Sequence, residues 1–426
     1  MSRNDESRQP APAGLSPERR RVIAAGGGAA ALAGLSQGTV AGLLLQGTGS
    51  AHAQAGGDLP IGIIKPMTGP LASSFVPLYM AADIAIDEIN AAGGILGRKL
   101  VKVEVDDEGS PAKQPAAMRS LVEKGIRIVV GPTGSSQAIA SLEVATPAKV
   151  IQGSYATAEE VGDGTRFPYH YQFVFHVGGQ AKRYLDGFEK MGIKELGMLS
   201  EDSAAGDSAK TSVNKMAPGR GFKLLSQQVF PIKTTDMTPF LRKLRADGTK
   251  GLIAYVSNNN DLTQFLVGLS RLGWKPPIIG HTGLLFLGMP GAVPDSVRYP
   301  DIYACTFRDL TYTDTEKIPA KVQAYCDKVM KANVPEAMLG PAATSPFYDF
   351  LWTVKRAAER AKSLDSEALK KAMDAFDGDG LYGKLHLSAS RHSAYDSDVV
   401  SLAMVNSVEE PTSKASRGLY RRRGPV

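Results

Sequence analysis

The sequence predicts an α/β protein built as two doubly wound lobes, and three observations support this fold class. The chain has 426 residues, which is more than a single hydrophobic core usually serves. Apolar residues make up 43% of it, enough to fill two cores. From Asp58 onward, short apolar segments alternate with amphipathic ones. This alternation is typical of parallel-type sheets covered by helices on both faces.

The first strand, loop and helix are the easiest to read. Leu59 to Lys65 is expected to be a strand, Met67 to Phe75 a loop, and Leu78 to Ala91 a helix. Apolar side chains recur along the helix at helical spacing, at Met80, Ile84, Ala85 and Ile89. Two glycines after Ala92 then provide the helix end.

The same reasoning continues along the chain. Further strands are expected at Leu100 to Val105, Arg127 to Val130, Lys149 to Gln152, Glu195 to Leu199, Phe222 to Val229, Gly251 to Val256, Pro277 to Ile279, near Leu385, and at Val399 to Val405. Helices are expected at Ala112 to Glu123, Gln137 to Ala145, Gln180 to Met191, Leu262 to Leu272, Pro319 to Lys331, Pro346 to Lys362 and Ser366 to Phe376. The turn-rich joins at 173–179 and 306–311 are the expected crossings between lobes.

The formal net charge of +6 is concentrated at the two ends of the chain. The first 53 residues contribute +2 and residues 411–426 contribute +5, so residues 54–410 carry −1. A nearly neutral body argues against a broad phosphate-binding face and therefore against a nucleic-acid partner. Residues 411–426 are expected to form a basic, flexible tail.

The first 53 residues have the features of an export signal. Arg19 and Arg20 precede an apolar run that extends to Leu45, and Ala51 and Ala53 place small residues at a cleavage site. We expect a twin-arginine signal peptide, cleavage after Ala53, and a periplasmic protein. A membrane span is the alternative, but six glycines dilute the apolar run, and no later segment is long and apolar enough to span.

The composition predicts no cofactor, no metal site and no enzyme activity. Cys305 and Cys326 cannot form the clustered ligand set of a zinc site, and either one bridge or two buried thiols is compatible with the sequence. A glycine-rich stretch at 26–31 lacks the preceding strand and the later acid of a dinucleotide site. No motif of a nucleophilic or zinc-dependent hydrolase is present.

Several segments, taken in order, resemble the periplasmic receptors for branched-chain amino acids and related solutes. Residues 61–70 read IGIIKPMTGP, 84–97 read IAIDEINAAGGILG, 105–111 read VDDEGSP, and 128–136 read IVVGPTGSS. The resemblance covers about 58–405. It implies the type I periplasmic-binding-protein fold, with two lobes joined by three crossovers that close on a ligand.

The resemblance also implies how the chain is divided and with what it works. The N-terminal lobe would take 58–175 with 308–380, and the C-terminal lobe 176–307 with 381–410. The protein would deliver its ligand to the membrane permease of an ABC importer. The expected ligand is a small carboxylate-bearing solute: a branched-chain or other amino acid, or a related organic acid or amide.

The loop at 131–136, GPTGSS, is the first candidate ligand contact. It follows a predicted strand and opens a helix, so free helix amides would bind a carboxylate, with Ser135 and Ser136 adding hydroxyl donors. No Lys or Arg follows in the position that a phosphate loop requires. Either serine could instead be the N-cap of that helix.

The next strand end, at Ser154, gives the second candidate contact. By the resemblance, Thr157 would bind the ligand through its side chain, and Tyr155 and Ala156 through their backbone. The position lies at the binding edge of an open α/β sheet. The alternative role for Thr157 is a helix cap before Ala158, Glu159 and Glu160.

Other positions in the candidate site depart from the family pattern. Ser74 and Ala205 stand where many relatives have an aromatic residue. Amino-acid receptors of this type often have an acid near the position of Thr282 that pairs with the ligand ammonium, and this chain has none there. Without that acid, the ligand could be a carboxylate without an α-amino group, an amide, or an amino acid held differently. Asp106, Glu201 or Asp202 is the alternative partner for an ammonium group, but these acids are expected instead to cap helices or face water, and His281 is expected to be structural.

Three functions are compatible with the predicted fold. A binding receptor accounts for the leader, the neutral body, the two lobes and the carboxylate loop together. A ligand-sensing regulator can have the same lobes but would need a DNA-binding segment or a cytoplasmic location. An NAD-type oxidoreductase lacks its glycine fingerprint after the first strand.

Overall fold

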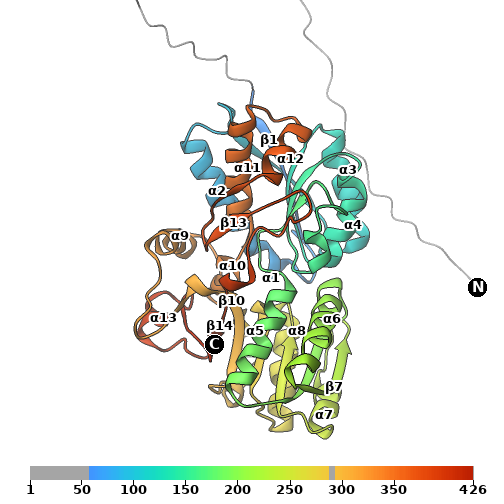
Figure 1. Cartoon of the computed structure of the whole chain (residues 1–426), viewed down its shortest axis with the longest axis vertical. Coiled ribbons are helices and arrows are strands. Elements are labelled where there is room, and N and C mark those ends of the chain that lie inside the picture. Colours follow the sequence, from blue (N-terminus) through green and yellow to red (C-terminus); the bar gives the residue numbers. More distant parts are fainter. Residues whose placement is uncertain (1–56, 287–292, 426) are drawn as a thin grey trace, which may run out of the picture. The chain divides into compact units, whose positions relative to one another are not determined.

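The computed structural model describes residues 57–286 and 293–425 (Figure 1). Its first main sheet contains β1 (Leu59–Lys65), β2 (Leu100–Asp106), β3 (Ile128–Thr133), β4 (Ile151–Tyr155) and β5 (His170–Tyr171). The strand order is β2-β1-β3-β4-β5, and all of these pairings are parallel. This sheet and the helices packed on it are called the first lobe below.

The second main sheet contains β6 (Glu195–Glu201), β7 (Lys223–Phe230), β8 (Gly251–Tyr255), β9 (Ile278–Gly280), β10 (Ile302–Phe307) and β14 (Val400–Met404). Its order is β14-β10-β9-β8-β6-β7. The β10–β14 pairing is antiparallel, and the others are parallel. This sheet and its helices are called the second lobe, and the predicted α/β class with parallel-type sheets is confirmed.

Alternate side chains of β1 point to opposite faces of the first sheet. Ile61 and Ile63 belong to the main core, whereas Ile64 packs with the smaller cluster that contains Leu121. The helices of this lobe are α2 (Met80–Ala91), α3 (Gln114–Glu123), α4 (Ser135–Ala145), α11 (Phe347–Ala361) and α12 (Ser366–Asp374). A Cβ at Gly153 would lie 2.4 Å from Phe350, so α11 packs directly against the backbone of β4.

The second sheet is covered in the same way. Its helices are α5 (Val177–Lys190), α6 (Ala204–Met216), α7 (Thr238–Ala246) and α8 (Asn259–Leu272), all visible beside the sheet in Figure 1. A Cβ at Gly187 of α5 would lie 2.6 Å from Ile279 of β9. Small residues therefore allow this helix to approach the strands closely.

The chain passes between the two sheets three times. It leaves the first sheet after Tyr171, returns after Phe307 toward α11, and enters the second sheet again at Val400. The second passage includes β11 (Thr311–Tyr312), α9 (Ala320–Lys331) and α10 (Leu339–Ala343). The third follows a small hairpin of β12 (Asp377–Asp379) and β13 (Lys384–His386).

The basic segment at 411–425 is ordered, and the expectation of a flexible tail is wrong. It forms α13 (Pro411–Ala415) and β15 (Arg421–Arg422), which pairs in parallel with β11. Arg422 Nε donates to Glu410 Oε2 at 2.7 Å, and Arg423 Nη1 donates to Glu316 Oε2 at 2.7 Å. Acidic partners within the fold thus compensate charges that the sequence suggested were solvated.

Two further expectations concern cysteines and membranes. Cys305 and Cys326 are both buried, and no disulfide joins them. Within 57–286 and 293–425, no helix combines the length and apolar character needed to cross a bilayer. The predicted signal peptide, with Arg19, Arg20 and Ala53, lies outside the described residues.

Candidate functional site

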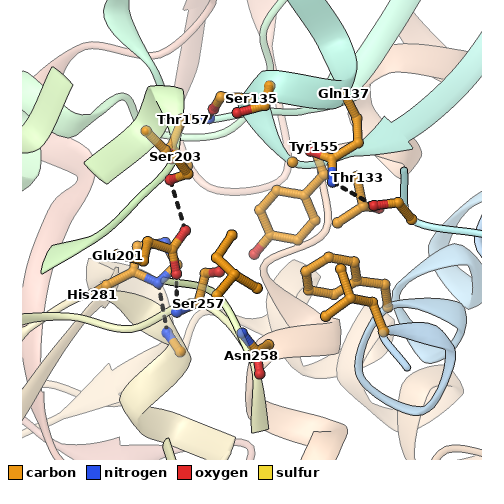
Figure 2. A pocket seen from close by; sticks show the side chains of 18 of the residues that line it. Thr133, Ser135, Gln137, Tyr155, Thr157, Glu201, Ser203, Ser257, Asn258 and His281 are labelled. Carbon is orange, nitrogen blue, oxygen red and sulfur yellow. Dashed lines mark hydrogen bonds between the residues drawn. The ribbon is translucent and has the colours of Figure 1, made fainter. Parts of the chain in front are cut away.

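A cavity of about 350 Å³ lies where strands of both sheets end. In Figure 2, Thr133, Ser135 and Gln137 of the first lobe lie in the upper part, and Glu201, Ser257 and Asn258 of the second lobe lie in the lower part. Carboxyl ends of parallel strands are the usual binding edge of such sheets. The lining residues are Leu71, Phe75, Leu78, Glu108, Gly109, Ser110, Pro111, Thr133, Gly134, Ser135, Ser136, Gln137, Tyr155, Thr157, Glu201, Asp202, Ser203, Ala205, Ile232, Lys233, Tyr255, Ser257, Asn258, His281, Thr282, Gly283, Phe286 and Pro341.

The first lobe presents the N-terminus of α4 to this cavity. Gly134 is the N-cap, with φ of 102°, and a Cβ there would lie 2.3 Å from Gln137 Oε1. Ser135, Ser136 and Gln137 follow as the first helical turn. Amides of a first turn have no acceptor within their own helix, so they are suited to bind an anion. The alternative that a serine caps α4 is wrong, because no side chain caps this helix.

Ser135 also organises the segment that follows β4. Its Oγ accepts hydrogen bonds from the amides of Thr157 and Ala158, each at 3.1 Å. The hydroxyl of Thr157 bonds to Tyr255 Oη at 2.7 Å, which joins the two lobes. Thr157 is not a helix cap, since the short helix that follows is preceded by Ala158 and has no side-chain cap.

Two of the predicted ligand serines contact helix ends of the second lobe. Ser136 Oγ accepts from the amide of Ala204, the first residue of α6, at 3.1 Å. Ser74 Oγ accepts from the amide of Asn259, the first residue of α8, at 3.2 Å. Ser136 lines the cavity, whereas Ser74 does not and its neighbour Phe75 does.

The remaining predicted residues fall into two groups. Tyr155, Ala205 and Thr282 line the cavity together with Ser135, Ser136 and Thr157. Ala156 is buried, is not part of the wall, and its carbonyl accepts from Gln172 Nε2 at 2.7 Å. Thr282 donates its hydroxyl to the Cys305 carbonyl at 2.7 Å. The ligand role of all these residues stays a prediction.

Glu201, at the end of β6, was expected to cap a helix or face water, and that expectation is wrong. Its side chain is only 3% exposed and lies in the cavity wall. One carboxylate oxygen accepts from Ser203 Oγ at 2.9 Å, and the other accepts from the Ser257 amide at 3.0 Å. Burial raises the pKa of Glu201 to about 7, despite these two donors and the Ser257 hydroxyl.

The other two acids behave differently. Asp202 lies in the cavity wall but is exposed. Asp106 fixes the loop after β1, because its carboxylate accepts from the Met67 amide at 2.9 Å and from the Thr68 hydroxyl at 2.5 Å. Asp106 therefore has a structural role outside the cavity wall.

His281 follows β9 and is buried against the ring of Tyr255, with ring centroids 4.4 Å apart. Its Nδ1 accepts from the Gly283 amide at 2.9 Å. Burial lowers the pKa of His281 to about 4, so the imidazole is neutral at pH 7. Within the described residues, no group of three or more His, Cys, Asp or Glu side chains is arranged to hold a metal.

Sequence reasoning did not select several wall residues of the second lobe, among them Tyr255, Ser257, Asn258 and Phe286. A usable signal existed for three of them. They lie at or just after the expected strand 251–256, and strand ends on this edge of an α/β sheet face the ligand crevice. Phe286 follows β9 by six residues and had no comparable signal.

Comparisons with known proteins agree with this geometry. A family model described as "Periplasmic binding protein" matches residues 58–407. "Leu/Ile/Val-binding protein homolog 7" of Brucella suis biovar 1 (strain 1330) is 26% identical over 340 residues, covering 76% of this chain and 83% of that protein.

Solved structures share the fold. The branched-chain amino acid transporter substrate binding protein LivJ from Streptococcus pneumoniae, in complex with isoleucine, has a TM-score of 0.65, 23% identity, and coverage of 82% of this chain and 96% of that one. A solute binding protein from R. palustris in complex with benzoate has a TM-score of 0.67, 19% identity, and coverage of 82% and 93%. The expected receptor fold is confirmed by these likenesses.

Proposed function

Because the chain belongs to the periplasmic binding protein family, we propose that it captures a small carboxylate-bearing solute between its lobes and passes it to an ABC importer. The observation that carries this proposal is the N-terminus of α4, which opens onto a cavity walled by both lobes. The protein acts as a receptor and does no chemistry on its ligand.

The carboxylate is the part of the ligand that the first lobe recognises. The first-turn amides of α4 and the partial positive charge of its N-terminus favour an anion. The hydroxyls of Ser135, Ser136 and Thr157 stand beside them in the wall. Apolar side chains, among them Leu71, Phe75 and Phe286, leave the rest of the cavity suited to a hydrocarbon skeleton.

The ligand class extends from amino acids to organic acids and amides. The relative from Brucella suis is named for leucine, isoleucine and valine, whereas the R. palustris structure contains benzoate. A carboxylate is common to isoleucine and benzoate. This shared group supports binding of a carboxylate at α4. The rest of the ligand would then contact the second lobe.

Lobe closure would trap this ligand and present the closed surface to the permease. Hydrogen bonds already cross between the lobes at Ser74, Ser136 and Thr157. Each joins a residue of the first lobe to a strand end or helix start of the second. These contacts support a hinge-closure cycle in which the closed form is held by a few hydrogen bonds between the lobes and by the ligand that both lobes contact.

A thermal-shift screen of the purified protein tests the proposal. The panel contains aliphatic amino acids, aliphatic and aromatic carboxylates, and amides. A ligand that binds only the folded state raises its melting temperature, by an amount that grows with concentration over Kd. We expect shifts from carboxylates, and a response confined to sugars or cations, added as comparison ligands, would contradict the proposal.

Export is tested separately. Family membership implies a periplasmic protein, and we propose that the twin-arginine leader takes it there, with cleavage after Ala53. Replacing Arg19 and Arg20 with Lys should leave uncleaved protein in the cytoplasm. An unchanged periplasmic yield in cell fractionation would refute this export route.

A further inference from the structure

Glu201 is a buried carboxyl group in the cavity wall that the carboxylate proposal does not use. Its hydrogen-bond partners are the Ser203 hydroxyl and the amide and hydroxyl of Ser257, all of them neutral, and the charged group that acts on it is the like-charged Asp261. In the described part of the chain, no Lys, Arg or His side chain forms an ion pair with it. An isolated buried charge is costly unless it is paired or hydrogen-bonded.

The two oxygens of Glu201 can accept more hydrogen bonds than they receive. An ionised carboxylate has about four acceptor sites, and the three donors above occupy three of them. The side chain lines the cavity, so a bound solute could supply further donors. A ligand donor there would supply a hydrogen bond that the carboxylate loses from water when it is buried.

Two neighbouring polar groups already use their hydrogen-bonding atoms within the protein, which makes Glu201 the better acceptor for a donor group of the ligand. The Thr282 hydroxyl donates to the Cys305 carbonyl, and His281 Nδ1 accepts from the Gly283 amide. Among the described wall residues, the other two carboxyls, Glu108 and Asp202, are exposed. Ala205 and Thr282, whose side chains are small, line the same cavity.

We propose that Glu201 is a specificity-determining residue that accepts hydrogen bonds from a donor group of the ligand, at the opposite wall from the carboxylate. This inference rests on the proposed function. The solute is then a carboxylate that also carries an ammonium or hydroxyl group. The raised pKa of Glu201 supports this role, since its ionisation state near pH 7 responds to the group that binds.

Calorimetry with two ligand series of constant skeleton tests the inference. The first series is leucine, 2-hydroxy-4-methylpentanoate and 4-methylpentanoate. The second is 4-aminomethylbenzoate, 4-hydroxybenzoate and 4-methylbenzoate. In at least one series, a member with a donor should bind the wild-type protein at least about tenfold more tightly than the member without one, the ratio that one hydrogen bond to a charged group supplies.

Glu201→Gln should remove most of that ratio while the donor-free member keeps its affinity. Gln can still accept from the Ser257 amide and donate to Ser203 Oγ, so the wall keeps its shape. Glu123→Gln is the matched control, because this acid at the end of α3 is exposed and lies outside the cavity wall, and it should leave the ratio unchanged. A melting curve of each variant confirms folding.

The pH dependence distinguishes the two kinds of donor. An ammonium ligand should bind more tightly as pH rises through about 7 in the wild-type protein, and this rise should be absent in Glu201→Gln. A hydroxyl ligand should show a shallower dependence, because a neutral donor gains less from the ionised carboxylate.

The outcomes separate the two proposals. If carboxylates bind but the ratio is the same in wild type and Glu201→Gln, Glu201 does not set specificity and the receptor function stands. If donor-free members bind as tightly as the others in both series, the inference fails in the same way. If none of the six carboxylates binds the folded wild-type protein, the proposed function falls and the inference with it.

Discussion

The two walls of the cavity present different polar groups to a ligand. The polar part of the first-lobe wall consists of backbone amides and hydroxyls around α4, and among its described residues the one carboxyl, Glu108, is exposed. The wall of the second lobe contains a buried acid, Glu201, and a buried imidazole, His281. Backbone amides keep one charge preference at every pH, whereas buried acids and imidazoles change with pH. The first wall therefore suits a constant ligand feature, and the second suits a variable one.

The largest expected effect concerns the first wall. Ser136→Ala combined with Thr157→Ala should weaken carboxylate binding by roughly 1 to 3 kcal/mol per lost hydrogen bond to a charged group, without unfolding the protein. Isothermal titration calorimetry measures the change. Ser120→Ala is the control, because its hydroxyl bonds to the Ala117 carbonyl within α3, away from the cavity. An unaltered affinity in the double variant would remove these hydroxyls from the site.

The second prediction concerns Glu201 in the ligand-free protein. Its folded pKa of about 7 lies above the ordinary value of 4.5, so its contribution to stability is present at low pH and is lost as pH rises through 7. Between pH 5 and pH 8 this loss amounts to roughly 2 to 3 kcal/mol. Glu201→Gln should lack it, and urea unfolding at both pH values measures the difference between variant and wild type. Parallel pH curves would show that the carboxyl is not buried in solution.

The third prediction has the opposite sign. The folded pKa of His281 is about 4, below its ordinary value of 6.5, so the unfolded chain binds a proton first as pH falls. Stability is lost from about pH 6.5 downward, by roughly 2 kcal/mol at pH 5. In His281→Asn, whose amide oxygen can accept from Gly283, this part of the acid sensitivity should disappear. Equal acid sensitivity in thermal melts would contradict it.

The smallest expected effect is at the contact between the walls. Ser74→Ala removes the acceptor for the Asn259 amide, at a cost of about 1 kcal/mol. Since that bond crosses between lobes, the loss should appear as faster hydrogen exchange at the start of α8, with β1 unchanged. Exchange that rises equally in both segments would indicate general destabilisation instead.

The sequence predicted what depends on local patterns. The bounds of β1 agree with the prediction, and α4 begins two residues earlier than expected, because Gly134 rather than a serine precedes its first turn. Strand β10 was not predicted, since its six residues are all buried and show no alternation. Its end had been assigned to a crossing between lobes.

The site, like the fold, was predictable where it depends on local sequence patterns. The serine loop and Thr157 lie in the wall because a strand, a glycine turn and a helix place them there. The burial of Glu201 could not be predicted, because it depends on Ser257 in the loop after β8 and on the first lobe closing over α6 through Ser136. Contacts between segments so distant in sequence leave no local pattern.

The packing of α11 has a consequence for the order in which the protein can be completed. Phe350 lies against Gly153 of β4, and Phe347 packs on Tyr79 with tilted rings whose centroids are 4.7 Å apart. These partners are separated by nearly the whole second lobe, so a ribosome must finish most of the chain before α11 can cover β4. Such non-local contacts slow folding and leave apolar surface exposed meanwhile. A nascent chain that stopped before Phe347 would contain every strand of the first sheet but not the helix that covers β4.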